Sequence, residues 1–189
     1  MVAGVILAGG LSTRANTNKL LLEVDGRPLI LHTIETLKPY VDRLIVVTGK
    51  FDEQLRPYLN DVEVVYNENY QLGMFSSVLK GVNDIDCDVV ILPGDMANIA
   101  HTTIETILNA NGLIRIPTYL GKRGHPLFLS SEILPSLKKE DIDSNLKEFL
   151  NKNEDKINLI PTNDQFIKID IDTIEDYQKF ISLRKETTL

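Results

Sequence analysis

The stretch VILAGGLSTRANTNKLLLEVDGRPLI, residues 5–30, combines an apolar run, two glycines, a polar loop and a lysine that precedes three leucines. The run VILA is apolar at successive positions, which is typical of a central strand covered on both faces. After the loop, Ile30, Ile34 and Leu37 recur at helical spacing. The chain therefore begins with a predicted strand, a loop of distinctive composition and a predicted helix.

The rest of the sequence repeats this alternation of strand and helix. Short β-branched runs predict strands at residues 2–8, 43–48, 62–66, 88–92, 112–117, 157–161 and 166–171. Helical spacing of apolar residues predicts helices at residues 28–38, 73–84, 98–110 and 173–185. We therefore expect an α/β fold with three layers, α/β/α, around a mixed but mostly parallel sheet, in one domain over residues 1–189.

The composition narrows the classes of partner. The chain has 189 residues, 43% of them hydrophobic, and a formal net charge of −7, which argues against nucleic acid or an anionic membrane as partner. No apolar stretch approaches the roughly 20 residues that span a bilayer, and no basic segment precedes the first apolar run. Since the chain also has a single cysteine, we expect a cytoplasmic protein.

The loop after the first predicted strand has the chemistry of a phosphate-binding site. Gly9 and Gly10 allow backbone N–H groups to approach a ligand closely. Arg14 and Lys19 add positive charge to the same loop. The spacing matches neither the dinucleotide-binding fingerprint nor the P-loop. The assembly suits a triphosphate, and a plain turn with surface cations is the alternative.

Acidic residues follow two of the predicted strands. Asp95 lies just past the strand at 88–92, where a carboxylate needs a cation or hydrogen-bond donors. Mg²⁺ would satisfy it beside a triphosphate, and capping of the helix that starts near residue 98 is the alternative. Asp170 and Asp172 are two residues apart, so they would face the same side of an extended strand. They also precede a predicted helix, which they could cap instead.

Two further segments contain candidate binding residues. Gly73 precedes a predicted helix with Ser76 and Ser77 in its first turn, where free N–H groups could meet a ligand or be capped by the serines. In GKRGHP, residues 121–126, His125 stands between a glycine and a proline beside two cations. A lone histidine is commonly structural or exposed, so its sequence context alone assigns it no role.

The chain resembles the MobA/MocA-like nucleotidyltransferases of molybdenum-cofactor processing. Four separated motifs follow the order of that family from Leu7 to Tyr177: LAGGLSTR with NKLLLEVDGRPLI, LGMFSSVLKGV, LPGDMANI, and IDIDTIEDY. The RGHP segment resembles the cytidylyltransferase branch of the family. The resemblance implies the nucleotide-diphospho-sugar transferase fold.

The same resemblance implies a role for each group of residues. Contacts to the nucleotide would come from Leu7, Ala8, Gly9, Gly10, Arg14, Lys19, Gly73, Met74 and Ser77. Arg14, Lys19 and Asp95 would act on the phosphates as catalytic residues. Asp95 and Asp170 would bind Mg²⁺. The acceptor would contact Arg123, Gly124, His125 and Asp172.

The implied reaction transfers CMP from CTP to the phosphate of molybdopterin and releases pyrophosphate, with a client molybdenum enzyme as a further partner. Gly9 makes the first motif LAGG, which resembles the guanylyltransferase branch, whereas cytidylyltransferases more often have LAAG. GTP is therefore an alternative donor, and another phosphorylated molecule is an alternative acceptor. Departures from the family pattern at Ala15, Ala97 and Ile174 leave room for a non-catalytic nucleotide- or cofactor-binding chaperone of a molybdenum enzyme.

Overall fold

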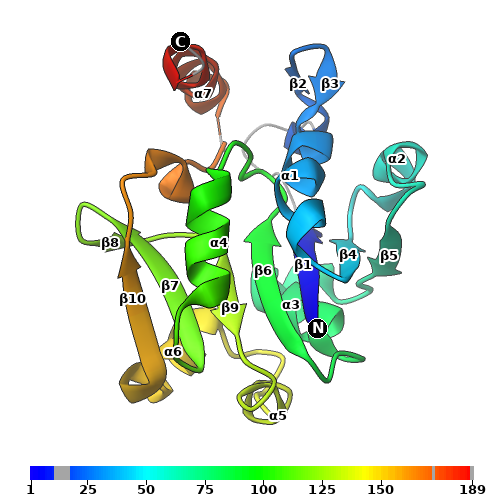
Figure 1. The fold of residues 1–189 in the computed structure, drawn as a ribbon. Coiled ribbons are helices and arrows are strands. Elements are labelled where there is room, and N and C mark those ends of the chain that lie inside the picture. Colours follow the sequence, from blue (N-terminus) through cyan, green and yellow to red (C-terminus); the bar gives the residue numbers. More distant parts are fainter. Residues whose placement is uncertain (11–17, 172, 188–189) are drawn as a thin grey trace.

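The computed structural model describes residues 1–10, 18–171 and 173–187 (Figure 1). Within these residues, eight strands form a mixed sheet in the order β10-β7-β9-β6-β1-β4-β5, with β8 paired to β7. The strands of this sheet are β1 (Val2–Ala8), β4 (Arg43–Thr48), β5 (Glu63–Tyr66), β6 (Asp88–Pro93), β7 (Ile114–Tyr119), β8 (Lys122–Arg123), β9 (Leu127–Leu129) and β10 (Ile157–Pro161). A separate hairpin consists of β2 (Glu23–Val24) and β3 (Arg27–Pro28).

Helices cover both faces of the sheet. They are α1 (Leu29–Leu37), α2 (Asp52–Leu55), α3 (Met74–Val82), α4 (His101–Asn109), α5 (Leu134–Leu137), α6 (Leu146–Lys152) and α7 (Ile174–Thr187). In Figure 1, α1 and α4 lie in front of the sheet, and α3 lies behind it. The predicted helices at 28–38, 73–84, 98–110 and 173–185 correspond to α1, α3, α4 and α7, with shifts of a few residues at their ends.

Two hydrophobic cores confirm the predicted three-layer α/β/α arrangement. Val5 and Leu7 of β1 belong to the core on the side of α3, α5 and α6. Ile6 and Ala8 belong to the core on the side of α1, α4 and α7. Since successive strand residues point to opposite faces, a strand that is buried on both sides must be apolar at every position. The run VILA therefore forms a central strand.

The strand register brings several loops to one edge of the sheet. β1 pairs in parallel with β4 and β6, so Leu7 lies opposite Pro93 and Ala8 lies opposite Thr48. The loops that follow these three strands consequently emerge at the same edge. β9 runs antiparallel to β6, with Leu127 opposite Ile91, so the segment before β9 reaches that edge as well. Because of this reversal, Gly124 and His125 line the same cavity as Lys19 and Asp95.

The strand predicted at residues 166–171 is wrong. Residues Gln165–Lys168 form a short 3₁₀ turn, η6, whose first N–H groups are capped by Asp164: its Oδ1 accepts a hydrogen bond from the backbone N–H of Phe166 at 2.9 Å. Phe166 and Ile167 are adjacent and both buried, whereas a strand would turn one of them to the opposite face. Phe166 packs edge-on against Phe180 of α7. The turn therefore directs both neighbours into the same core, whereas a strand would point them to opposite faces.

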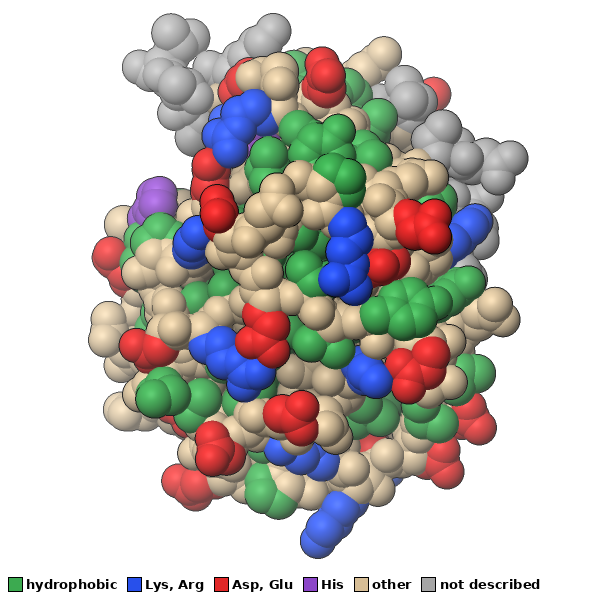
Figure 2. All heavy atoms as spheres, turned by 90° about the vertical axis from the view of Figure 1, so that its right-hand side faces the viewer, with side chains coloured by type: hydrophobic (Ala, Val, Ile, Leu, Met, Phe, Trp, Pro, Cys, Tyr) green, Lys and Arg blue, Asp and Glu red, His purple; other side chains and the backbone are tan. Residues whose placement is uncertain are grey.

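The surface that carries α2 and β5 is mixed in charge. Figure 2 shows acidic and basic side chains interspersed on this face, with apolar side chains between them. Such a distribution is that of an ordinary hydrated surface. Of the helices in the described ranges, none has the length and apolar character needed to cross a bilayer.

Candidate active site

The glycine loop packs tightly against the start of α3. A Cβ added to Gly9 would lie 2.7 Å from Ser77 Oγ, and a Cβ added to Gly49 would lie 2.7 Å from the Gly9 carbonyl oxygen. Real Cβ atoms do not approach other atoms this closely, so the loops after β1 and β4 and the helix α3 meet here only because both positions lack side chains. Gly10, by contrast, is exposed, and a Cβ there would meet nothing within 4 Å among the described residues.

A cavity of about 280 Å³ lies at this junction; we call it the first cavity. Its wall contains all eight of the described residues that the resemblance assigns to the nucleotide. They are Leu7, Ala8, Gly9, Gly10, Lys19, Gly73, Met74 and Ser77. Asp95 completes the wall on the side of β6. Arg14, which was also predicted to bind the nucleotide, lies outside the described residues.

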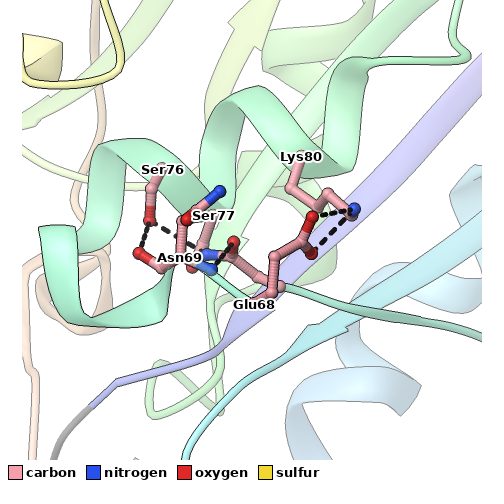
Figure 3. A network of polar contacts seen from close by, with 6 residues as sticks. Glu68, Asn69, Ser76, Ser77 and Lys80 are labelled. Carbon is pink, nitrogen blue, oxygen red and sulfur yellow. Dashed lines mark hydrogen bonds and ion pairs between the residues drawn. The ribbon is translucent and has the colours of Figure 1, made fainter.

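Hydrogen bonds hold the start of α3 in place (Figure 3). Ser76 Oγ donates to the carbonyl oxygen of Gly73 at 2.8 Å, and Asn67 Nδ2 donates to Ser77 Oγ at 3.0 Å. Gly73 has a φ of +98°, which only glycine adopts without strain. Ser76 therefore ties the first turn of α3 back to the segment before it without capping the free N–H groups of the helix. The hydrogen bond from Asn67 orients Ser77 on the wall of the first cavity.

Lys19 and Asp95 form an ion pair at the sheet edge. The Nζ of Lys19 lies 2.6 Å from Oδ2 of Asp95, and these side chains are 20% and 10% exposed. Asp95 does not cap α4, because the backbone N–H of Ala100 donates to Asp164 Oδ2 at 2.7 Å instead. The alternative explanation of Asp95 as a helix cap is thus excluded. The carboxylate is buried and its charge is balanced by Lys19, as the cost of burial requires.

A second cavity, of about 680 Å³, adjoins the first and shares the Lys19–Asp95 pair with it. Its wall also contains the described residues predicted to contact the acceptor, Arg123, Gly124 and His125, together with Asp170. The structure therefore brings Lys19, Asp95 and Asp170 to one place, although Asp170 comes from far along the chain. Asp172 lies outside the described residues. The start of α7 is capped by reciprocal hydrogen bonds between Thr173 and Asp176. Asp170 is therefore not required as a cap of this helix.

The RGHP segment is fixed by its contacts with η6. The backbone N–H of His125 donates to the carbonyl oxygen of Ile167 at 2.7 Å, and a Cβ on Gly124 would overlap that same oxygen. Burial lowers the pKa of His125 from 6.5 to about 4, and the negative charge of Asp95 opposes this shift. The imidazole is therefore neutral at pH 7, with one nitrogen that donates and one that accepts a hydrogen bond. Arg123 is more exposed and pairs with Glu154.

Several side chains that line these cavities were not predicted from the sequence. Phe51 and Tyr70 lie on the wall of the first cavity, and Lys147 and Lys168 lie on the wall of the second. Phe51 follows β4, so the rule that ligands collect beyond the carboxyl ends of parallel strands could have found it. Lys147 stands in a polar segment, residues 138–156, and no signal in its sequence marks it as a cavity residue.

The two carboxylates fit a divalent metal ion that bridges to phosphate. Asp95 and Asp170 face the same cavity, and hard cations such as Mg²⁺ prefer one or two carboxylates together with phosphate oxygens. Among the described residues, no group of three or more His, Cys, Asp or Glu side chains could hold a metal by itself. The arrangement therefore suits a metal that arrives with a nucleotide rather than one held in a protein cage.

Comparisons with known proteins agree with this geometry. The MobA-like NTP transferase domain family matches residues 4–157. Molybdenum cofactor cytidylyltransferase of Escherichia coli K12 is 27% identical over 179 residues, which cover 92% of each chain. A probable molybdenum cofactor guanylyltransferase of Thermococcus sibiricus is 29% identical over 145 residues, which cover 72% of this chain and 73% of that protein. Longer curated relatives also match, and the chain spans 25% to 37% of their length.

The fold is shared with solved structures. A Mycobacterium tuberculosis protein in complex with manganese superposes with a TM-score of 0.79 at 22% identity, over 96% of this chain and 98% of that one. The family match covers most of the chain and spans the glycine loop, α3, Asp95 and the RGHP segment. The chain therefore belongs to the MobA-like NTP transferase family and is a nucleotidyltransferase related to the molybdenum cofactor cytidylyl- and guanylyltransferases.

Proposed function

We propose that this nucleotidyltransferase transfers CMP from CTP to the phosphate of molybdopterin and releases pyrophosphate, with Mg²⁺ as the metal. One observation carries the proposal: the ion-paired Lys19 and Asp95 belong to the walls of both cavities. A nucleoside triphosphate in the first cavity would present its α-phosphate at this junction. A phosphorylated acceptor in the second cavity would approach the same point from the other side.

The chain supplies positioning and charge rather than a dedicated base. An oxygen of the acceptor phosphate attacks the α-phosphorus, a new P–O bond forms, and the bond to the β-phosphate breaks so that pyrophosphate leaves. A phosphate monoester has a second pKa near 6, so it is largely ionised at neutral pH and needs no proton removed. Lys19 would then exchange Asp95 for the phosphates of the nucleotide, and backbone N–H groups of Gly9 and Gly10 would face the same charge.

Asp95 and Asp170 are the residues that would hold the metal. A bound Mg²⁺ would neutralise charge on the phosphates as the P–O bonds exchange. The solved relative in complex with manganese supports a divalent ion on this fold. The choice of Mg²⁺ over Mn²⁺ is part of the proposal.

The choice of CTP rests on the resemblance of the RGHP segment and of the KLLL run to the cytidylyltransferase branch. Gly9 favours GTP instead, since LAGG is the pattern of the guanylyltransferase branch. The relatives include proteins named for each activity. GTP is therefore the second candidate donor.

The lining of the second cavity fits an acceptor that has both a negatively charged group and a larger, partly apolar group. Lys147, Lys168 and Arg123 lie around its wall, and Met96, Ile116 and Leu150 contribute apolar surface. Neutral His125 adds a hydrogen-bonding group that does not repel or attract a charge. Molybdopterin, a pterin with a terminal phosphate, has this combination. We expect the reaction to take place in the cytoplasm, with a molybdenum enzyme as recipient of the product.

The test is pyrophosphate release by the purified chain with molybdopterin and either CTP or GTP, in the presence of Mg²⁺. The proposal predicts faster release with CTP. Faster release with GTP would overturn the choice of base. Release only with another phosphorylated acceptor would overturn the choice of acceptor. An absence of release under all conditions, together with binding of nucleotide, would favour a chaperone for a molybdenum enzyme.

A further inference from the structure

Two buried side-chain nitrogens have no hydrogen-bond partner among the described residues: Asn18 Nδ2 and His125 Nδ1. Buried polar groups are nearly always hydrogen-bonded, and an unpaired one costs about as much as a lost hydrogen bond. Asn18 lines the first cavity and His125 lines the second. Each cavity wall therefore contains one of these two nitrogens, and the Lys19–Asp95 pair belongs to both walls. His125 was already expected to contact the acceptor, whereas nothing in the sequence assigned Asn18 a role.

The orientation of the Asn18 amide follows from its own capping contact. Asn18 Oδ1 accepts a hydrogen bond from the backbone N–H of Leu20 at 3.2 Å, which caps the 3₁₀ turn η1 (Lys19–Leu21). Since the oxygen is committed to the turn, the other end of the amide must be Nδ2, which can only donate. The residue as a whole is 8% exposed, so water has little access to this donor.

The surroundings of Asn18 favour an anion as the missing partner. Lys19 is the next residue and lies in the same wall, to which Gly9 and Gly10 also belong. A buried N–H donor beside a lysine and a glycine loop matches the donor set of phosphate sites. We propose that Asn18 Nδ2 donates a hydrogen bond to a phosphate oxygen of the bound nucleoside triphosphate. This inference rests on the proposed nucleotidyl transfer and adds a phosphate contact to it.

The test separates the capping role of Asn18 from the ligand contact. Serine caps helical turns about as well as asparagine, so Asn18→Ser should keep the melting temperature within about 2 °C of the wild type. Asn18→Asp also keeps the cap but buries a carboxylate, so its fold is checked separately by circular dichroism. Neither variant offers the N–H donor. Asn18→Asp also places a negative charge near the phosphate. We expect the Kd for inorganic triphosphate with Mg²⁺, measured by calorimetry, to rise roughly tenfold in Asn18→Ser and further in Asn18→Asp.

Asn145 provides the matched control. Its side chain caps α6 in the same way, with Oδ1 accepting from the backbone N–H of Glu148 at 2.9 Å, and it is exposed. Asn145→Ser should leave triphosphate binding unchanged. Unchanged binding in both Asn18 variants would overturn the inference and leave the cap as the only role of this residue. Failure of the wild-type chain to bind inorganic triphosphate would overturn the inference and the proposed function together. Inorganic triphosphate contains neither a base nor an acceptor. A preference for GTP or for another acceptor in the pyrophosphate-release assay would therefore overturn the proposed function but not the phosphate contact of Asn18.

Discussion

The Lys19 ammonium lies 2.6 Å from the Asp95 carboxylate, and both residues belong to the walls of two adjoining cavities. Lys19 follows the loop after β1 and Asp95 follows β6, and the parallel pairing of Leu7 with Pro93 brings these two segments together. When a phosphate binds the Lys19 ammonium, the Asp95 carboxylate loses this partner and becomes free to bind a metal ion instead.

Asp95→Asn should abolish catalysis while the fold persists. Asparagine has nearly the same shape but cannot balance Lys19 or bind a metal as a carboxylate does, so we expect kcat/KM for pyrophosphate release to fall at least about a hundredfold. Asp164→Asn is the matched control, because Asp164 caps α4 through Ala100 and lies away from Lys19. That variant keeps only one of the two side-chain oxygens that accept from the N–H groups of Ala100 and Phe166, so it should lose about 1 kcal/mol of stability and keep its turnover. Equal activity losses in both variants would contradict a catalytic role for Asp95.

Lys19→Met should raise the KM for the nucleotide and lower kcat. The change removes the cation that faces the triphosphate and leaves the Asp95 carboxylate buried without its partner, so we expect a loss of about tenfold or more in kcat/KM. Lys80→Met is the control, since Lys80 pairs with Glu68 at 2.9 Å on the surface and such pairs contribute little. Steady-state kinetics with varied nucleotide would measure both. An unchanged KM in Lys19→Met would contradict the proposed phosphate contact.

His125 should make the stability of the chain depend on pH. Burial lowers its pKa to about 4, whereas in the unfolded chain the pKa is about 6.5. Between these values the unfolded state binds a proton that the folded state does not, so the free energy of unfolding falls as pH drops from about 6.5 to about 4. His125→Asn removes this contribution. Urea unfolding at pH 7 and pH 4.5 should show that the wild type loses about 2 kcal/mol more than the variant over this range. Parallel losses in the two proteins would contradict the burial argument.

Gly9→Ala should disturb Ser77 rather than the sheet. The new Cβ would lie 2.7 Å from Ser77 Oγ, so the serine must rotate and weaken its hydrogen bond from Asn67. We expect a loss of about 1 kcal/mol in the free energy of unfolding. Adding Ser77→Ala removes the clashing oxygen, so the double variant should be more stable than the two single losses predict. Additive losses in this double-mutant cycle would show that the clash is absent.

Metal binding should depend on the nucleotide. No group of three or more potential ligands among the described residues could hold a metal by itself, so Asp95 and Asp170 alone should bind Mn²⁺ weakly. Calorimetry should show a large gain in Mn²⁺ affinity once CTP is present. EDTA should stop turnover and leave the melting temperature of the nucleotide-free chain unchanged. Tight Mn²⁺ binding without nucleotide would reveal a preformed site instead.

Much of the fold could be predicted from the sequence because burial on both faces leaves a direct pattern. VILA forms β1, and the helically spaced residues after Pro28 form α1. The strand was wrongly predicted at 166–171 because apolar and polar residues alternate in FIKIDI. The segment begins as a 3₁₀ turn instead, because Asp164 caps it and both Phe166 and Ile167 enter the same core. β9 has only three residues, and its antiparallel place between β6 and β7 is decided by its neighbours. The local sequence pattern does not contain information on which strands lie next to β9.

The candidate site could be predicted as a set of residues but not as a geometry. The rule that loops at the carboxyl ends of parallel strands meet at one edge explains why Gly9 and Asp95 lie together. It does not give the ion pair between Lys19 and Asp95, nor the division into two cavities. The unpaired nitrogen of Asn18 was equally invisible, because it depends on which atoms the fold leaves without a partner.

The most direct test of the account is a crystal structure of the chain with an unreactive CTP analogue and Mg²⁺. We predict that the triphosphate lies on Gly9 and Gly10 in the first cavity, with Lys19 on its phosphates and the metal touching Asp95 and Asp170. A nucleotide bound elsewhere on the molecule, or a metal that contacts neither carboxylate, would contradict the account.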